Sequence, residues 1–275
     1  MLLKYLINMD RKTKIIATVG PSLSSESKIK KIIDTGANVL RINFSHGTLE
    51  DHENVISWAR KSNKQVAIMQ DIQGPKIRTG ISSENTFLEK SKNVTLTNIE
   101  TESNNDIVFI NYENLLRDIN VDDRVFIDDG QIVLKVVEKE NDKLEALILI
   151  GGELRDNQGV AFPDSNLSVS AITEKDKEHL KFGSEHDVDF VAVSFVRNAS
   201  DINLVKEIIP KDVKVIAKIE LKTALDNIDE ILDVADGVMV ARGDLGVQLP
   251  LEQVPFVQKQ ILDAANKRGK ISITA

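Results

Sequence analysis

Two stretches of the chain decide the fold: residues 238–246, VMVARGDLG, and residues 215–220, VIAKIE. Each is a short apolar run that ends in charged side chains. Runs of this length are typical of strands buried on both faces of a parallel sheet. In an α/β barrel, charges at the C-terminal ends of such strands lie at the mouth of the active site. The two runs bring one ammonium group, Lys218, and two carboxylates, Glu220 and Asp244.

Length and composition narrow the class of protein. The 275 residues are 41% hydrophobic and 28% charged, as in soluble globular proteins, and they suffice for a large domain with an insertion. The net charge of −8 argues against a nucleic-acid partner. The absence of cysteine excludes disulfides, thiolate zinc sites and cysteine nucleophiles. It also fits a reducing compartment.

The N-terminus and the hydropathy pattern bear on location. Residues 1–10 are too short and too interrupted for a signal peptide, and we interpret them as a leading arm. No apolar segment reaches the roughly 20 residues that a membrane span needs. We therefore expect a cytoplasmic protein with no membrane partner.

Strand and helix patterns alternate in the first part of the chain. The expected strands cover residues 14–19, 39–44 and 65–70, and the expected helices cover 25–33 and 48–62. This order implies a parallel sheet. After Gly-Pro the pattern changes to short alternating runs and turn residues, which predicts a compact all-β insertion.

Two features within the expected insertion support strands. An Asp-Gly turn between the apolar runs 125–127 and 131–134 predicts a hairpin, because Asp-Gly suits a tight turn with positive φ. Residues 144–150 form another apolar run. Beyond the insertion, a capping pattern at 173–176 predicts the start of a helix, and strand–helix alternation resumes.

The whole pattern comprises about six and a half strand–helix units around one insertion. It predicts an α/β fold of the (β/α)₈ TIM type, incomplete at its C-terminal end, with an inserted all-β domain. We divide the chain into residues 1–75 (strands one to three), 76–170 (the insertion) and 171–275 (strands four to seven). The remaining strand–helix units of the barrel are expected to be absent.

Lys218 and Glu220 are two residues apart in a strand, so their side chains point to the same face. At a barrel mouth they could meet Asp244 from the next strand. Mg²⁺ favours one or two carboxylates plus substrate oxygens, and a lysine could then stabilise developing negative charge. The alternative is an ordinary Lys–Glu ion pair at a strand end, which the spacing favours equally.

Two further segments carry polar side chains that suit phosphate. Arg41 and Asn43 share a face, and Ser45 and His46 follow. A guanidinium beside neutral oxygens suits a phosphate next to a cation. Alone, this segment is better explained as a capped loop with a surface arginine. Residues 71–80 connect the third strand to the insertion and carry two cationic side chains, Lys76 and Arg78, that could reach a polyphosphate. The alternative is that the segment is a simple linker between domains.

These segments together resemble the pyruvate kinase family, and the resemblance covers nearly the whole chain after the first ten residues. In the family's order, the matching motifs are TVGPS (18–22), RINFSHG (41–47), GPKIRTG (74–80), DDG (128–130), KIE (218–220) and MVARGDLG (239–246). The last two of these motifs are specific to the family, and the other four support them.

The resemblance implies Mg²⁺-dependent phosphoryl transfer from phosphoenolpyruvate to ADP in glycolysis, giving pyruvate and ATP. Lys218 would neutralise charge on the phosphoryl group in flight and on the enolate. Glu220 and Asp244 would bind Mg²⁺. The amides of Gly243 and Asp244 would hold the substrate carboxylate, and Arg41 would contact the transferred group.

The resemblance also implies a monovalent-cation site formed by Asn43, Ser45, Asp71 and the carbonyl of Ile72. Lys76 stands where potassium-dependent members have glutamate. This variant is similar to members that need no potassium, so we expect the Lys76 ammonium to occupy the place of K⁺.

The nucleotide side would comprise Asn43, Phe44, Ser45, His46 and Arg78, with the insertion closing over it as a mobile lid. The family's basic residue before Gly-Val in that insertion is Gln158 here, which puts one nucleotide contact in doubt. After the KIE motif, Leu221 stands where many members have asparagine.

The largest departure is at Ala275, since the resemblance implies a remaining part of the barrel and a C-terminal regulatory domain beyond it, both of which we expect to be absent. If the chain is the whole protein, we expect weak activity or none. Family members are commonly homotetramers, with part of that interface in the missing region. The competing hypotheses are a non-catalytic chain that still binds Mg²⁺ and phosphoenolpyruvate, and another oxo-acid barrel enzyme. The insertion and the 41–46 segment argue against the latter.

Overall fold

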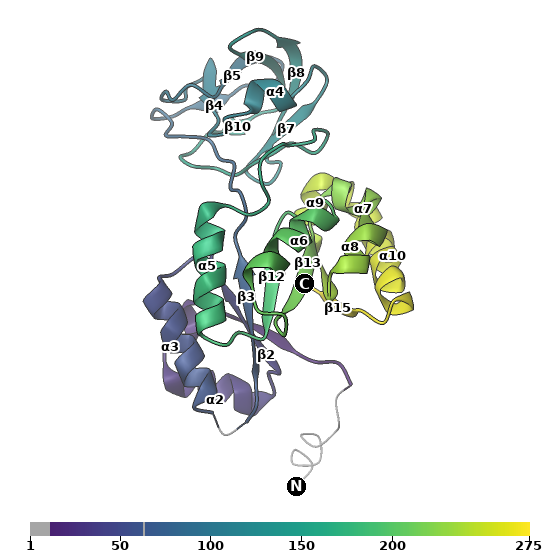
Figure 1. The fold of residues 1–275 in the computed structure, drawn as a ribbon. Coiled ribbons are helices and arrows are strands. Elements are labelled where there is room, and N and C mark those ends of the chain that lie inside the picture. Colours follow the sequence, from purple (N-terminus) through teal and green to yellow (C-terminus); the bar gives the residue numbers. More distant parts are fainter. Residues whose placement is uncertain (1–11, 63) are drawn as a thin grey trace.

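The computed structural model describes residues 12–62 and 64–275 (Figure 1). The expected leading arm at residues 1–10 lies outside the described residues. Within the described part, no helix is both long enough and apolar enough to cross a membrane.

A seven-stranded sheet forms the centre of the larger part, and every pair of neighbouring strands is parallel. Its spatial order follows the chain, with the insertion entering between the third and fourth strands. The strands in that order are β1 (Ile16–Val19), β2 (Val39–Asn43), β3 (Ala67–Ile72), β12 (Phe190–Val193), β13 (Lys214–Ile219), β14 (Gly237–Val240) and β15 (Ile271–Thr274).

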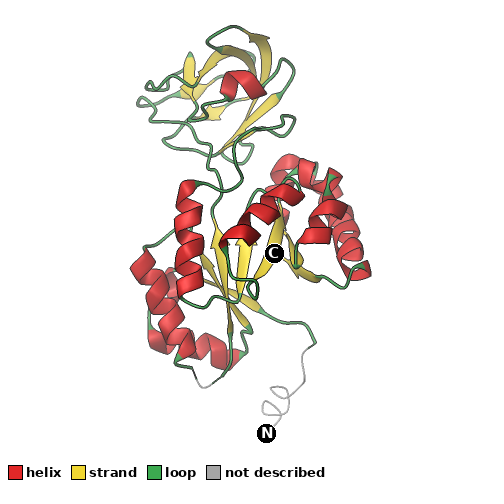
Figure 2. Cartoon of the chain, viewed as in Figure 1, coloured by secondary structure: helices red, strands yellow, loops and turns green. Residues whose placement is uncertain are grey.

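Helices flank this sheet and bury its apolar side chains (Figure 2). Thr48 and Thr173 each begin a helix with a complete capping box, as the pattern at 173–176 predicts. The α-helices of this part are α2 (Glu26–Thr35), α3 (Leu49–Arg60), α5 (Glu174–Glu185), α6 (Ala199–Ile208), α7 (Lys222–Asp226), α8 (Ile228–Val234), α9 (Arg242–Gln248) and α10 (Val254–Lys267); the 3₁₀ helices are η1 (Pro21–Leu23) and η2 (Leu251–Gln253).

The central strands β13 and β14 are buried on both faces, which confirms the prediction for these two runs. One face packs against the helices. The opposite face carries a smaller apolar cluster of Met69, Ala192, Ile216 and Met239. Because the side chains of a strand alternate between faces, polar residues near the strand ends on this second face are brought together at one edge of the sheet.

The insertion is a separate β structure with its own apolar core. Its main sheet has six strands in the order β11-β7-β8-β9-β5-β6, and β4 pairs with β10. The strands are β4 (Phe87–Leu88), β5 (Asn93–Thr97), β6 (Ile107–Phe109), β7 (Arg124–Ile127), β8 (Ile132–Lys139), β9 (Leu144–Ile150), β10 (Gly152–Glu153) and β11 (Val160–Ala161).

The predicted hairpin joins β7 to β8, and Asp128, Asp129 and Gly130 all have positive φ there. The prediction of a purely β insertion is wrong in one detail, because α4 (Leu115–Asp118) is a short helix. One helical turn is too short to give a helical period in the sequence. The same reason explains why α7 and α8, which connect β13 to β14, are not predicted.

The insertion lies beyond the C-terminal end of β3, where the chain leaves the large sheet (Figure 1). The chain returns through residues 163–173 to α5. The guanidinium of Arg197, which follows β12, donates from Nη1 to the carbonyls of Leu167 and Val169 at 2.6 and 2.7 Å. These bonds attach the returning segment to the large sheet.

Candidate active site

A buried lysine lies at the centre of the charged strand ends. The Nζ atom of Lys218 is 2.7 Å from Glu220 Oε1 and 3.3 Å from Asp71 Oδ1, and it donates to Ser194 Oγ at 2.7 Å. These residues lie on or just beyond β13, β3 and β12. The ion pair that the alternative interpretation expects is therefore present. It is almost inaccessible, since Lys218 is 8% exposed and Glu220 2%.

Asp71 extends the charged group toward β2 and β1. Its Oδ2 accepts a hydrogen bond of 2.6 Å from Arg41 Nε, and Arg41 Nη1 donates to Thr18 Oγ1 at 3.0 Å. The parallel register pairs Thr18 with Arg41 and Asn43 with Asp71, so these side chains meet across neighbouring strands. One carboxylate thus orients both the lysine and the arginine.

Two contributors follow β12 that the sequence did not predict. Ser194 Oγ donates to the carbonyl of Ile72 at 2.8 Å while it accepts from Lys218. The amide of Phe195 donates to Glu220 Oε2 at 2.7 Å, and Phe195 has φ of 54°. Positive φ is uncommon for an aromatic residue, and such backbone strain is concentrated at functional sites. A polar residue at the end of an apolar run was the available signal for Ser194.

Burial and charge act against each other at this site. Burial raises the pKa of Glu220, the Lys218 charge lowers it, and the negative charge of Asp244 raises it; the pKa remains above its ordinary value. Burial alone lowers the pKa of Lys218, but attraction to Glu220 and Asp71 outweighs it and raises the pKa. Lys218 therefore stays an ammonium at neutral pH.

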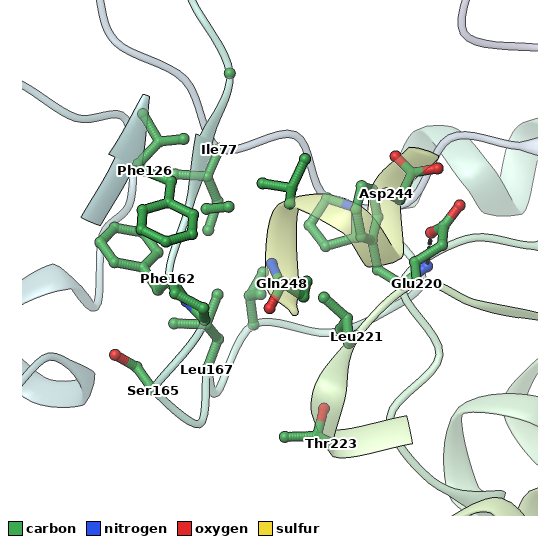
Figure 3. Close-up of a pocket in the computed structure, with 18 of the residues that line it drawn as sticks. Ile77, Phe126, Phe162, Ser165, Leu167, Glu220, Leu221, Thr223, Asp244 and Gln248 are labelled. Atoms are coloured by element: carbon green, nitrogen blue, oxygen red, sulfur yellow. Dashed lines mark hydrogen bonds between the residues drawn. The ribbon is translucent and has the colours of Figure 1, made fainter. Parts of the chain in front are cut away.

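A cavity of about 260 Å³ opens beside these strand ends, between the large sheet and the insertion (Figure 3). Glu220 and Asp244 both line it, and Asp244 is exposed in the first turn of α9 next to Gly243. Figure 3 shows the two carboxylates on neighbouring elements at one end of the cavity.

The carboxylates fit a divalent cation. Burial of Glu220 and repulsion from Asp244 both disfavour the charged form of Glu220. A cation bound between the two carboxylates would favour the charged form of each. Among the described residues, no group of three or more His, Cys, Asp or Glu side chains could hold a metal. The other ligands would therefore be substrate and water oxygens, as Mg²⁺ prefers.

The expected nucleotide residues after β2 take different positions. Asn43 Oδ1 accepts from the Ser45 amide at 3.0 Å, and His46 is exposed. Phe44 is 2% exposed, and its ring centroid lies 4.1 Å from that of His52. Strand alternation turns the Phe44 side chain toward the helices, so the predicted nucleotide contact at Phe44 could involve only its backbone.

The predicted monovalent-cation site is occupied by protein contacts. Asp71 pairs with Arg41 and Lys218, and the Ile72 carbonyl accepts from Ser194. Lys76 makes no ion pair within the described residues and lies instead along the cavity wall. Burial, then repulsion from Arg78 and Lys175, lowers the Lys76 pKa. Its predicted place beside Asp71 is not seen.

Arg78 and Gln158 are the two residues of the insertion for which the sequence predicts or questions a nucleotide contact. Arg78 also lines the cavity, and its Nη1 donates to the carbonyl of Asn157 at 2.6 Å. Gln158 is 7% exposed, and its Oε1 accepts from the Arg155 amide at 2.9 Å. Its side chain is therefore inside the insertion, so it does not replace a basic residue facing the cavity.

The fold and the site define a class: a parallel α/β domain with a lysine–carboxylate centre at the C-terminal ends of its strands, as in α/β barrel enzymes. The chain belongs to the pyruvate kinase family, since the family model described as "Pyruvate kinase, barrel domain" matches residues 10–275.

Relatives named pyruvate kinase agree with this assignment. The protein from Thermotoga maritima is 43% identical over 273 residues, which cover 96% of this chain and 59% of that protein. The protein from Staphylococcus aureus strain MRSA252 is 44% identical over 275 residues, which cover 96% and 47% respectively. The chain thus spans about half the length of the curated relatives it matches.

Proposed function

We propose that this chain carries the centre at which a pyruvate kinase transfers a phosphoryl group from phosphoenolpyruvate to ADP. The observation that carries the proposal is the buried Lys218 ammonium, 2.7 Å from Glu220 and 3.3 Å from Asp71 at the strand ends. A fixed cation next to a metal-binding carboxylate is what a reaction that moves negative charge requires.

The residues have distinct roles in this proposal. An oxygen of the ADP β-phosphate attacks phosphorus in line, the bond from phosphorus to the enol oxygen breaks, and ATP and the enolate form. Lys218 stabilises charge on the phosphoryl group and then on the enolate oxygen. Arg41, held by Asp71, contacts the transferred phosphoryl group. Protonation of the enolate at carbon gives pyruvate.

Glu220 and Asp244 would hold Mg²⁺ at the cavity. The metal would supply charge neutralisation between the transferred group and the enol oxygen. The amides of Gly243 and Asp244, in the first turn of α9, would orient the substrate carboxylate. Because Lys218 and Arg41 are held by carboxylates before substrate arrives, little reorganisation is needed during transfer.

The insertion acts as a lid in this proposal, and the larger part is an incomplete barrel of the TIM type. Arg78 reaches the cavity from the insertion, while Asn43, Ser45 and His46 lie on the β2 side for the nucleotide. Closure would exclude water, which otherwise competes with ADP for the phosphoryl group.

Potassium independence remains part of the proposal, with a changed rationale. Arg41 and Lys218 already neutralise Asp71, so these two cations supply the charge that K⁺ would bring. Lys76 adds a third positive group near the cavity. A large rise in activity on adding KCl at constant ionic strength would refute independence.

The expected setting is the cytoplasm, with phosphoenolpyruvate, ADP, ATP and pyruvate as ligands and a homotetramer as the assembly of the full-length protein. None of these ligands requires a nucleic acid or a membrane. The chain's net charge of −8 agrees with that.

Pyruvate formation from phosphoenolpyruvate, ADP and Mg²⁺ tests the function, with Lys218→Met as the blank and with K⁺ present or absent. We expect ADP-dependent pyruvate that disappears in the variant. Activity no higher than that of the variant would instead favour a chain that binds Mg²⁺ and phosphoenolpyruvate without catalysis. Pyruvate formed without phosphorylation of ADP would indicate a different oxo-acid barrel enzyme.

A further inference from the structure

The cavity that holds Glu220 and Asp244 at one end has an apolar opposite end. Phe126 and Phe162 face it from the insertion, while Leu221, which follows Glu220 in the chain, lines the cavity beside the carboxylates on the side of the large sheet (Figure 3). The proposed phosphoryl transfer involves none of these three side chains. The apolar end is therefore a feature that the chemistry of phosphoenolpyruvate and ADP leaves without a role.

The size of the cavity is sufficient for a ring. Its volume is about 260 Å³. An apolar protein cavity of about 150 Å³ binds benzene. The cavity as a whole is therefore large enough for a phenyl or branched alkyl group together with a small polar group beside the carboxylates.

Leu221 is the residue whose position is least explained by folding. It is the N-cap residue of α7, with φ of −115° and ψ of 148°, and it makes no side-chain capping bond. Asn, Asp, Ser and Thr are strongly preferred at such positions, and leucine is disfavoured. The leucine side chain lines the cavity instead of capping the helix.

Charge determines which polar group would accompany the apolar one. Lys76, Arg78 and Lys222 line the cavity and make no ion pair within the described residues, so an anion is favoured there, and a cation between Glu220 and Asp244 would bind its oxygens. A carboxylate with an adjacent carbonyl meets both requirements, because its two oxygens can chelate one metal.

We propose that this cavity is a subsite for an aryl or branched alkyl group carried by a metal-chelating 2-oxo acid or its amide, with Leu221 as a specificity-determining residue. The inference rests on the proposed function for the metal end of the ligand. The apolar end rests on the cavity itself. Such a ligand would occupy the substrate position and contact both the large sheet and the insertion.

Calorimetric titration of the full chain with oxamate and with N-benzyloxamate, each with Mg²⁺, tests the proposal. The two probes share the chelating group, and only the second carries a ring. We expect N-benzyloxamate to bind about tenfold more tightly or better, since burying a ring of this size is worth that much. Without Mg²⁺ both affinities should fall.

Leu221→Asn is the matched variant. Asparagine has nearly the same size and is a preferred N-cap residue, so the fold should be retained. We expect it to remove most of the gain from the benzyl group and to leave oxamate binding unchanged. Leu204→Asn, at a 43% exposed position on α6 outside the cavity, is the control and should preserve the gain.

The outcomes separate the subsite from the proposed function. Equal affinities for the two probes, with Mg²⁺-dependent binding of both, would overturn the subsite and leave the metal site intact. A benzyl gain that persists in Leu221→Asn would overturn the location next to Leu221. Failure of both probes to bind with Mg²⁺ would contradict the metal site, and with it both proposals.

Discussion

The large sheet and the insertion bury different kinds of side chain. In the large sheet and its helices, the buried ionisable groups are His52, Asp71, Asp176, His179, Asp201, Lys218 and Glu220. The insertion has one nearly inaccessible carboxylate among its described residues, Asp118, whose side chain is 7% exposed, and its fully buried polar residues are uncharged: Thr79, Thr86, Thr97, Ser103 and Gln158. Buried charge is costly unless it is paired. The difference indicates that the chemistry belongs to the large sheet, while packing and hydrogen bonding explain the insertion.

The largest expected effect comes from Lys218→Met. The change leaves Glu220 buried without its cation and Asp71 with Arg41 alone, which should cost about 3–5 kcal/mol of unfolding free energy, measured by denaturant titration. In the insertion, Lys135→Met breaks only an exposed pair with Asp122 and should cost less than about 1 kcal/mol. If both variants lost the same small amount of unfolding free energy, buried charge in the large sheet would not differ in stability from exposed charge in the insertion.

A substitution that creates a cavity in the insertion tests whether the two apolar cores unfold independently. Leu134 is fully buried in the core of the insertion, so Leu134→Ala should cost about 2–5 kcal/mol. Because the two cores are separate clusters, native-state hydrogen exchange should show the loss in the insertion and not in the large sheet.

Val191→Ala, in the core of the large sheet, is the reciprocal variant and should give the opposite pattern. If both variants reduced protection in both parts equally, the two cores would have to unfold as one cooperative unit.

The Asp118 carboxylate of the insertion should make the free energy of unfolding depend on pH. Burial alone would raise the pKa of Asp118, but hydrogen bonds from Tyr112, Ser168 and Arg117 outweigh it and lower the pKa to about 2. Its contribution is therefore complete above the unfolded pKa near 4 and is lost as pH falls toward 2. Thermal unfolding between pH 5 and 2 should show a loss on the order of 2 kcal/mol.

Asp118→Asn should be less stable at pH 5 and should lose much less stability on acidification than the unmodified chain. The control is Asp106→Asn, an exposed position in the insertion. An acid response in Asp118→Asn as steep as in the unmodified chain would assign the effect to other carboxylates.

The smallest expected effect concerns the attachment between the two parts. Arg197→Lys retains a positive charge near Asp201 but loses the fork that reaches the Leu167 and Val169 carbonyls. We expect amides 165–170 to exchange several-fold faster, which corresponds to about 1 kcal/mol of local stability. Arg268→Lys, at a position that pairs with the exposed Asp229 and Asp233 and reaches the Ala264 carbonyl, should leave these amides unchanged.

The sequence predicts the long elements and the principal ion pair because both depend on simple periods. Two-residue alternation places Lys218 and Glu220 on one face, and the structure brings them to 2.7 Å. The same alternation places the Phe44 side chain on the face opposite Asn43, where the structure has it buried.

Other parts of the site depend on information that periods do not contain. The role of Asp71 in holding both Arg41 and Lys218 arises from the register of β2, β3 and β13 across the sheet. The positive φ of Phe195 is a tertiary feature that no local pattern reports. The position of Lys76 along the cavity, away from Asp71, follows from how the insertion leaves β3.

The central claim is that Glu220 and Asp244 bind a divalent cation beside Lys218. Electron paramagnetic resonance of Mn²⁺, which favours the same oxygen ligands as Mg²⁺, measures this without requiring turnover. The account predicts one site per chain, weakened at least about tenfold by Asp244→Asn and unaffected by Asp129→Asn, which lines the cavity from the β7–β8 turn of the insertion. Mn²⁺ binding that is the same in Asp244→Asn as in the unmodified chain would contradict the claim.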